Sequence, residues 1–457
     1  MTKKLNIEKF LIGLSGFRVV ASLLCVFTYF SGPHYIRQID TLGVSFRYFL
    51  RFSVSMESFK TIFLPAVLTA GDSIGITPME FPILNLLFAP FFFGGHIFGI
   101  TSIRFFVIIL NLLLIYLNYR EWEGEELDGV KLSKAFLFIP ILSIGQTYID
   151  KFMPDLTAFL LLSLAMGYQL GNKKKNRLLS FVCASLGLLI KPPVVIALGP
   201  MLFLLKPRDL IKEISLWIIP SLVVCLLYYT LGTGYLKELS DLPPYFAVHF
   251  RDPFSSLIGV FSKPKLLFSF LVKDVFNSYI LIPILAWDIY VKAFKKQVGI
   301  PNKYWAVLAL QLLCVFALAD SHLYLHNYYA IGSSFLAILI ILTFLKRCHL
   351  KYLCILVTLA VSVNQIETIL HRMKPFRKEH LFKQCREIKK KIDFQNEKKI
   401  RSSYSPYPTL GLCLGVIQNS KVSKYGVYFK DEISEEWQKV FETKDLVVID
   451  HKSEKEK

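Results

Sequence analysis

Long apolar stretches alternate with short charged segments along most of the chain. Runs of about 20 apolar residues are typical of helices that cross a membrane. They predict helices at about 11–30, 79–98, 100–119, 133–149, 156–170, 214–231, 277–293, 303–319, 328–346 and 351–368, and a helical hairpin at 178–205. The pattern indicates an all-α polytopic membrane protein.

Lysines and arginines orient these helices, because they accumulate in cytoplasmic loops. Three lysines among the first nine residues place the N-terminus in the cytoplasm, and the cluster GNKKKNR at 171–177 is a second cytoplasmic marker. Five apolar stretches lie between the markers, so one of them does not cross. We expect 79–98 to be re-entrant or interfacial, because two prolines and Glu80 open it and two glycines end it.

The same rule gives about eleven transmembrane helices, with the C-terminus outside. It places a long first outer loop at 31–98 and a second outer loop at 150–155. The hairpin at 178–205 turns on the outer side at LIKPPVV, because its prolines cannot continue a regular helix. The first span contains Arg18 and lacks a small-residue cleavage site, so we expect it to remain uncleaved.

The tail at 372–457 differs in its sequence pattern from the transmembrane region that we assign to 1–371. Its first part has helical spacing of apolar residues among charges, and short strand-like runs such as YGVYF and DLVVID follow. We expect a small extracytoplasmic α/β domain; a partly disordered basic tail is the alternative. Cys385 and Cys413 fall in this tail and can pair if it is extracytoplasmic.

Composition supports the membrane interpretation. Apolar residues make up 54% of the 457 positions, and the formal net charge is +19. In a membrane protein, cytoplasmic loops and anionic headgroups account for such a charge better than nucleic acid does. Short cytoplasmic loops and the absence of a retention signal point to a bacterial inner membrane and a role in the cell envelope.

Three of the carboxylates on the predicted outer face are candidates for chemistry: Asp40, Glu80 and Asp155. Asp40 is either functional or a solvated residue paired with Arg37 on a helix. Asp155 precedes an apolar helix and can serve as its N-cap. Glu80 is surrounded by apolar residues and prolines, and a charge near membrane depth usually faces a cavity or a partner.

Carboxylates gathered on one outer face suit two tasks. One can act as the general base that takes a proton from an attacking hydroxyl. Asp155 and Asp40 can also hold a divalent metal, Mg²⁺ or Mn²⁺, that neutralises a phosphate leaving group. Phosphate and sugar contacts can come from basic and aromatic residues, although interfacial tyrosines are as often membrane anchors: Arg37, Lys191, His326, Tyr328 and Tyr329.

Five segments occur together in a recognisable order: RQIDT at 37–41, GITPMEFPILNLL at 75–87, MPD at 153–155, LGLLIKPP at 186–193 and HNYYAIG at 326–332. In this they resemble the GT-C glycosyltransferases, specifically the family of protein O-mannosyltransferases and aminoarabinose transferases. The resemblance implies a GT-C fold and transfer of a sugar from a polyprenyl-phosphate donor to a lipid, glycan or protein acceptor at the outer face.

The resemblance also implies roles for single residues. Asp40 would be the catalytic aspartate of the first loop, and Asp155 the acidic residue near the lipid phosphate and its metal. Glu80 would match the acidic position of the EFP segment, and Lys191 would lie near the phosphate. Two alternatives stay open: a polysaccharide polymerase or ligase that uses diphosphate-linked oligosaccharides, and a lipid or polysaccharide transporter.

Overall fold

The structure is a computed structural model, and its contacts divide the chain into two units. The model describes residues 7–27, 35–52, 81–142, 148–149, 151–171, 175–232, 252–272, 280–319, 327–348, 350–373, 379–392, 400–402, 414, 416, 424–430, 439–443 and 446–451. Unit 1 comprises residues 1–25, 106–227 and 249–371, and unit 2 comprises residues 26–105, 228–248 and 372–457.

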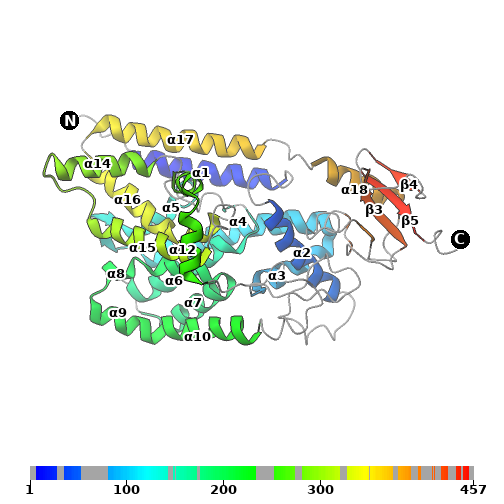
Figure 1. Cartoon of the computed structure of the whole chain (residues 1–457), viewed down its shortest axis with the longest axis horizontal. Helices are drawn as coiled ribbons and strands as arrows, with labels where there is room; N and C mark the ends of the chain where they lie inside the picture. Colours follow the sequence, from blue (N-terminus) through cyan, green and yellow to red (C-terminus); the bar gives the residue numbers. More distant parts are fainter. Residues whose placement is uncertain are drawn as a thin grey trace. The chain divides into compact units, whose positions relative to one another are not determined.

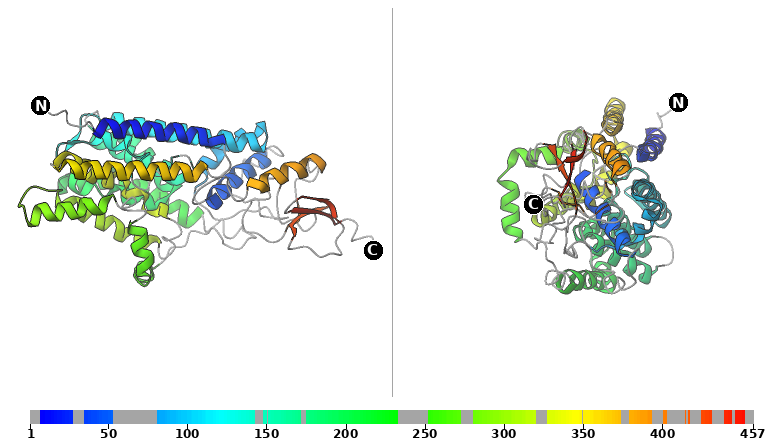
Figure 2. Two further views of the ribbon diagram at one scale, coloured as in Figure 1. Left: turned by 90° about the horizontal axis from the view of Figure 1, so that it is seen from above. Right: turned by 90° about the vertical axis from the view of Figure 1, so that its right-hand side faces the viewer.

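Unit 1 is built mainly from helices, and it also contains a short antiparallel pair of strands, β1 (Glu126–Leu127) and β2 (Val130–Lys131). Its long helices run in roughly one direction, and the right-hand view of Figure 2 shows several of them end-on (Figures 1 and 2). The helices that lie wholly in this unit are α1 (Ile7–Leu24), α5 (Leu132–Leu137), α6 (Pro154–Leu170), α7 (Arg177–Ile190), η6 (Pro192–Leu198), α8 (Met201–Leu204), α9 (Pro207–Glu213), η7 (Ile214–Ile218), α10 (Ile219–Leu227), α12 (Pro253–Phe261), α13 (Pro264–Phe270), α14 (Leu281–Ala293), α15 (Asn302–Ala319), η11 (Asn327–Ser333) and α16 (Ser334–Arg347).

Two further long helices extend from this unit into the other. Helix α4 (His96–Glu121) begins in unit 2 and ends in unit 1, and α17 (Lys351–Met373) does the reverse over its last two residues. Among the described residues, four helical stretches are long and apolar enough to cross a membrane: Ile97–Glu121, Pro207–Leu231, Tyr329–Arg347 and Tyr352–Leu370. The protein is therefore an integral membrane protein, as predicted, although this count does not reproduce the eleven spans.

The predicted spanning helix at 133–149 does not form as one helix. Helix α5 ends at Leu137, and turns follow over 138–142. Pro140 explains the early end, because proline has no N–H to donate and disfavours helical geometry at the preceding residue. The prediction of one regular spanning helix over 133–149 is therefore wrong.

The apolar stretch at 79–98 contains no long helix in its described part, which starts at Phe81. Helix α3 (Ile83–Phe88) continues into the 3-10 helix η4 (Ala89–Gly94), and Gly95 then turns the chain with φ of +95°. Together they are about 21 Å long, whereas the hydrocarbon core is about 30 Å thick. The length agrees with the predicted absence of a full crossing here.

Part of the expected outer loop is helical. Residues Tyr35–Phe52 form α2, which packs against α3 and η4 in unit 2. Val44 and Tyr48 of α2 form a buried apolar cluster with Ala89 of η4. Asp40 and Arg37 therefore stand on a helix and not in an irregular loop. The 3-10 helix η1 (Cys25–Phe27) precedes this segment and lies in unit 2 except for Cys25, and the π-helix η8 (Tyr228–Gly232) lies wholly in unit 2.

The C-terminal region contains the predicted mixture of helix and strands. Helix α18 (Glu379–Lys391) is followed by β3 (Tyr425–Phe429), β4 (Lys439–Glu442) and β5 (Leu446–Asp450). The strands form an antiparallel sheet in the order β3-β5-β4. Helix α18 lies beside this sheet (Figures 1 and 2), and Thr443 Oγ1 donates a hydrogen bond to Gln384 Oε1 at 2.6 Å.

Cys385, on α18, forms a disulfide. The six described cysteines elsewhere in the chain are free thiols, so the partner of Cys385 lies outside the described residues. The predicted partner, Cys413, is also outside them. Disulfides persist in oxidising compartments and are rare in the cytosol, which favours an extracytoplasmic tail.

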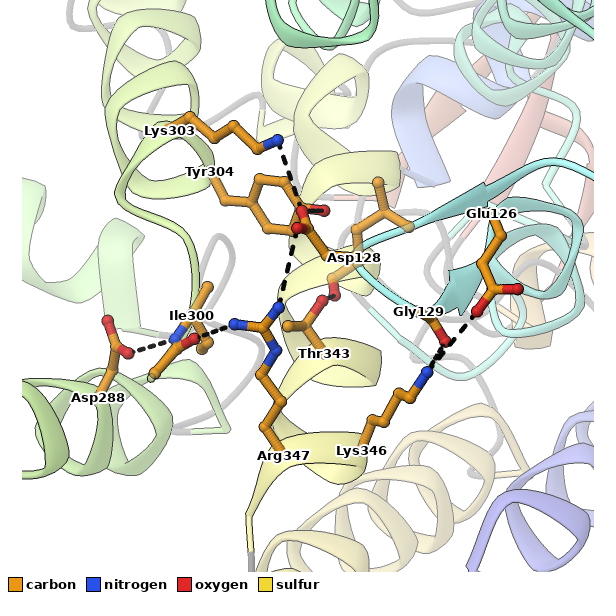
Figure 3. A network of polar contacts seen from close by, with 12 residues as sticks. Glu126, Asp128, Gly129, Asp288, Ile300, Lys303, Tyr304, Thr343, Lys346 and Arg347 are labelled. Carbon is orange, nitrogen blue, oxygen red and sulfur yellow. Dashed lines mark hydrogen bonds and ion pairs between the residues drawn. The ribbon is translucent and has the colours of Figure 1, made fainter. Parts of the chain in front are cut away.

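A network of charged and polar side chains joins loops of unit 1 that the sequence places on the cytoplasmic side (Figure 3). It centres on Asp128, in the turn between β1 (Glu126–Leu127) and β2 (Val130–Lys131). Asp128 Oδ2 accepts a hydrogen bond from Tyr304 Oη at 2.7 Å and lies 3.5 Å from Lys303 Nζ, while Arg347 lies 3.8 Å from Oδ1. One carboxylate thus connects the β1-β2 turn to α15 and α16.

Candidate active site

The candidate site begins at the first turn of α6. Pro154 occupies the first helical position, where its missing N–H costs nothing, and Met153 is the N-cap with no side-chain capping bond. Asp155 is therefore not the N-cap that the sequence offered as an alternative. Its side chain is fully buried. A carboxylate near the positive end of a helix dipole is favourably placed, but its burial still requires a cationic or polar partner.

Lys191 supplies that partner. Helix α7 ends at Ile190 because Pro192 and Pro193 follow, and Lys191 itself has an extended backbone with φ of −155°. Its Nζ lies 3.7 Å from Asp155 Oδ1, and its side chain is 6% exposed. The helix break that the sequence predicted at LIKPP therefore directs the ammonium group towards the first turn of α6.

An aromatic ring completes the described part of the site. Lys191 Nζ lies 5.3 Å from the centre of the Tyr329 ring, which is carried by the 3-10 helix η11. A cation at this distance from a ring face is attracted to it. We call Asp155, Lys191 and Tyr329 the buried triad after its two buried, charged members, while Tyr329 itself is half-buried. The triad brings together segments that lie far apart in the sequence.

Two glycines allow the supporting elements to approach closely. A Cβ on Gly187 of α7 would lie 2.9 Å from the Ala158 carbonyl of α6, and a Cβ on Gly332 of η11 would lie 2.3 Å from the Ile196 side chain of η6. Both contacts are too short for a real Cβ. Close packing of α6 with α7, and of η6 with η11, is what places Lys191 between Asp155 and Tyr329.

Asn111 of α4 forms hydrogen bonds with residues on both sides of Asp155 in the sequence. Its Nδ2 donates to the Ile149 carbonyl at 3.4 Å, and its Oδ1 accepts from Thr157 Oγ1 at 2.9 Å. All of these groups are buried, where a satisfied polar pair is favoured over an open one. Asn111 therefore fixes the residues before and after Asp155 against α4.

Lys151 is a further charged residue at this place that the sequence reasoning missed. It is 2% exposed, its Nζ has no hydrogen-bond partner among the described residues, and it lies 5.3 Å from the centre of the Tyr148 ring. Burial, and to a lesser extent the nearby Arg18 guanidinium, together lower the pKa of Lys151 to about 7. In the sequence, TYIDKFMPD looks like a solvated loop, so no signal marked this lysine as buried.

The other predicted residues are only partly described. Asp40 and Arg37 lie on α2, and Tyr328 lies on η11, but the description of all three stops at the backbone. Glu80 and His326 lie outside the described residues. The structure thus brings Asp155, Lys191 and Tyr329 together and leaves the geometry of the remaining predicted residues open.

The described residues do not form a metal site. They contain no group of three or more His, Cys, Asp or Glu side chains that could hold a metal ion. A hard divalent cation needs several oxygen ligands, whereas the buried triad offers one carboxylate, which Lys191 already contacts. The Mg²⁺ or Mn²⁺ predicted at Asp155 and Asp40 stays a prediction.

Comparison with known proteins adds evidence on the fold. No protein-family model matches the chain, and no curated protein matches its sequence. Among solved structures, the chain is similar to ArnT from Cupriavidus metallidurans in the apo state, with a TM-score of 0.57, 12% identity, and coverage of 96% of this chain and 97% of ArnT. The chain has the fold of ArnT.

A second structure, ArnT from Cupriavidus metallidurans bound to undecaprenyl phosphate, gives the same result. Its TM-score is 0.59 at 11% identity, with coverage of 96% of this chain and 98% of ArnT. The likeness covers nearly the whole of both chains, including the C-terminal region. This likeness is one of fold, and it agrees with the fold that the sequence motifs led us to expect.

Proposed function

We propose that this protein is a membrane glycosyltransferase that moves a sugar from a polyprenyl-phosphate donor to an acceptor at the outer face of the membrane. The single observation that carries the proposal is the buried triad within a fold like that of ArnT. A lysine held in the protein interior by a carboxylate and a tyrosine suits a ligand that brings its own negative charge. The undecaprenyl phosphate bound by an ArnT structure is a ligand of that kind.

The proposed role of Lys191 is to bind the donor phosphate and to stabilise the charge that it gains. In the transfer step, the acceptor oxygen or nitrogen bonds to the anomeric carbon, and the bond from that carbon to the phosphate oxygen breaks. The electron pair stays on the polyprenyl phosphate, whose added charge a preorganised cation stabilises. Tyr329 keeps the ammonium group oriented, and Asp155 is its partner while the phosphate is absent.

The proposed role of Asp40 is general base. It would take the proton that the acceptor hydroxyl or amine loses on attack. The position of Asp40 in the first outer segment, and the motif RQIDT that surrounds it, support this assignment. Glu80, Arg37, His326 and Tyr328 are proposed to orient the donor sugar, the phosphate or the acceptor, on the strength of the sequence resemblance.

The sidedness of the reaction has support from the tail. A disulfide at Cys385 favours an oxidising, extracytoplasmic compartment for α18. Helix α18 follows α17, one of the four long apolar helices, after only five residues. We therefore propose a bacterial inner-membrane protein with a cytoplasmic N-terminus, and with its acceptor site and C-terminal region outside.

The test is sugar transfer in membranes that contain a labelled polyprenyl-phosphate sugar. We expect transfer by the native protein and loss of at least about a hundredfold in Lys191→Met and Asp40→Asn, with Lys212→Met, an exposed lysine on α9, as the matched control. Transfer only from diphosphate-linked oligosaccharides would support a polymerase or ligase. Movement of lipid across sealed vesicles without covalent transfer would support a transporter, and either result would overturn the proposal.

A further inference from the structure

The segment at 372–391, which includes α18, is strongly basic. Between residues 372 and 391, nine of 20 positions are Lys or Arg and two are Asp or Glu. On the helix itself, the buried positions form one stripe that faces the sheet: Gln384, Cys385, Ile388 and Ile392 at its end. The disulfide of Cys385 and the hydrogen bond to Gln384 fix that stripe against the rest of the region.

The opposite face of α18 is basic and exposed. At 100° per residue, Lys383, Arg386 and Lys390 fall within about 60° of one another and point away from the buried stripe. All three side chains are exposed, as are Lys389 and Lys391 at the end of the helix. We call Lys383, Arg386 and Lys390 the basic face.

The membrane is the anionic surface that chain connectivity keeps within reach of this face. Only five residues separate the end of α17 at Met373 from the start of α18 at Glu379. Such a connection spans at most about 20 Å when fully extended. Because the preceding stretch of α17 is long and apolar enough to cross a membrane, α18 cannot move far from the headgroup layer.

The charge of this segment also opposes the topology that the disulfide favours. Lysines and arginines next to a membrane span usually lie in the cytoplasm. A disulfide in α18 favours the outer side of the membrane. On that side, the lysines and arginines do not help to set the orientation of the preceding helix α17. Their density is accounted for if they bind an anion, and the headgroups of acidic phospholipids are a partner of matching charge.

We infer that the basic face of α18 docks onto anionic phospholipid headgroups of the outer leaflet and holds the C-terminal region against the membrane. Polybasic helices beside a membrane bind in this way, through charge and not through one specific headgroup. The attraction falls off within a Debye length, about 8 Å at physiological ionic strength and about 3 Å in 1 M salt. The inference concerns a surface distinct from the buried triad and does not depend on the proposed sugar transfer.

The test uses the full chain in lipid nanodiscs of phosphatidylcholine with or without phosphatidylglycerol. We expect phosphatidylglycerol to slow hydrogen exchange in residues 379–391, and 1 M salt to reverse the effect. In the variant Lys383→Gln/Arg386→Gln/Lys390→Gln, the factor by which phosphatidylglycerol slows this exchange should be at least about tenfold smaller. The charge-preserving variant Lys383→Arg/Lys390→Arg should behave like the native protein.

A matched control removes the same number of exposed charges elsewhere. Lys206→Gln/Arg208→Gln/Lys212→Gln alters α9 and its N-cap residue Lys206, and it should keep the full phosphatidylglycerol effect. An intact disulfide at Cys385 in each variant shows that the C-terminal region still folds. Equal exchange in both kinds of nanodisc, or equal loss in the control, would overturn the inference, as would full competition by millimolar inorganic phosphate.

Discussion

The ion pair between Asp155 and Lys191 makes a prediction that separates structural from functional roles. At 3.7 Å and an effective dielectric constant of about 20, two unit charges attract each other by about 4 kcal/mol. Both side chains are buried, so solvent screens this attraction little. Lys191→Met should therefore destabilise the protein by about 3–5 kcal/mol, because a carboxylate stays buried without its ammonium partner.

The double variant is the decisive one. In Asp155→Asn/Lys191→Met neither charge remains, and a buried ion pair replaced by neutral groups is often no less stable than the original. We expect stability close to that of the native protein and a coupling free energy of about 4 kcal/mol in the double-mutant cycle. The measurement is denaturant-induced unfolding in mixed micelles, followed by circular dichroism.

A matched pair on the protein surface provides the control. Lys303 and Asp128 lie 3.5 Å apart, yet the Lys303 side chain is 42% exposed. The same cycle at this pair should give a coupling of about 0–1 kcal/mol, as is usual for solvated ion pairs. A coupling below about 1 kcal/mol at Asp155 and Lys191 would refute the argument that burial strengthens that pair.

The double variant also tests function independently of folding. It should unfold like the native protein but bind polyprenyl phosphate at least about tenfold more weakly, because the cation that meets the phosphate is gone. Native-like binding would show that Lys191 serves stability alone. The same binding measurement on Lys303→Met should show no change.

Three further outcomes are expected. Asp40→Asn should abolish sugar transfer without lowering the unfolding midpoint, and transfer at the native rate would remove Asp40 as the base. Lys151→Met should raise the free energy of unfolding by up to about 4 kcal/mol at pH 7. The reason is that a buried lysine with a pKa of about 7 makes the native protein less stable as the pH falls from 10 to 7. The gain should shrink towards pH 10, and a gain that is constant with pH would contradict this. Asp128→Ala should lower the free energy of unfolding by about 1–3 kcal/mol, because it removes the acceptor of the Tyr304 hydrogen bond. Glu126→Ala should change it by no more than about 0.5 kcal/mol. Equal effects of the two variants would show that the network does not stabilise the fold.

Much of the architecture could be predicted from local pattern. Apolar runs predicted α4, α16 and α17, because burial in lipid requires continuous apolar surface and an internally bonded backbone. The break after Ile190 followed from Pro192 and Pro193, since proline acts on its own neighbours. The strands β3 and β5 followed from short β-branched runs.

Other predictions failed where a local signal competed with the apolar pattern. The run at 133–149 is apolar enough for a span, yet Pro140 limits its helix to Leu132–Leu137. The first outer segment was expected to be a loop, but the face of α2 that packs on α3 and η4 stabilises a helix at 35–52. Tertiary contacts of this kind override a mixed-polarity sequence.

By itself, the sequence determined that the chain lies in a membrane, where its helices break, and which carboxylates and cations could act. Only the tertiary structure decided that Lys191 meets Asp155 and Tyr329, because close approach at Gly187 and Gly332 joins segments that no local pattern connects. It also decided that Lys151 is buried, since a loop residue's exposure depends on what packs over it. Local sequence sets backbone preference, and long-range packing sets the distances on which chemistry depends.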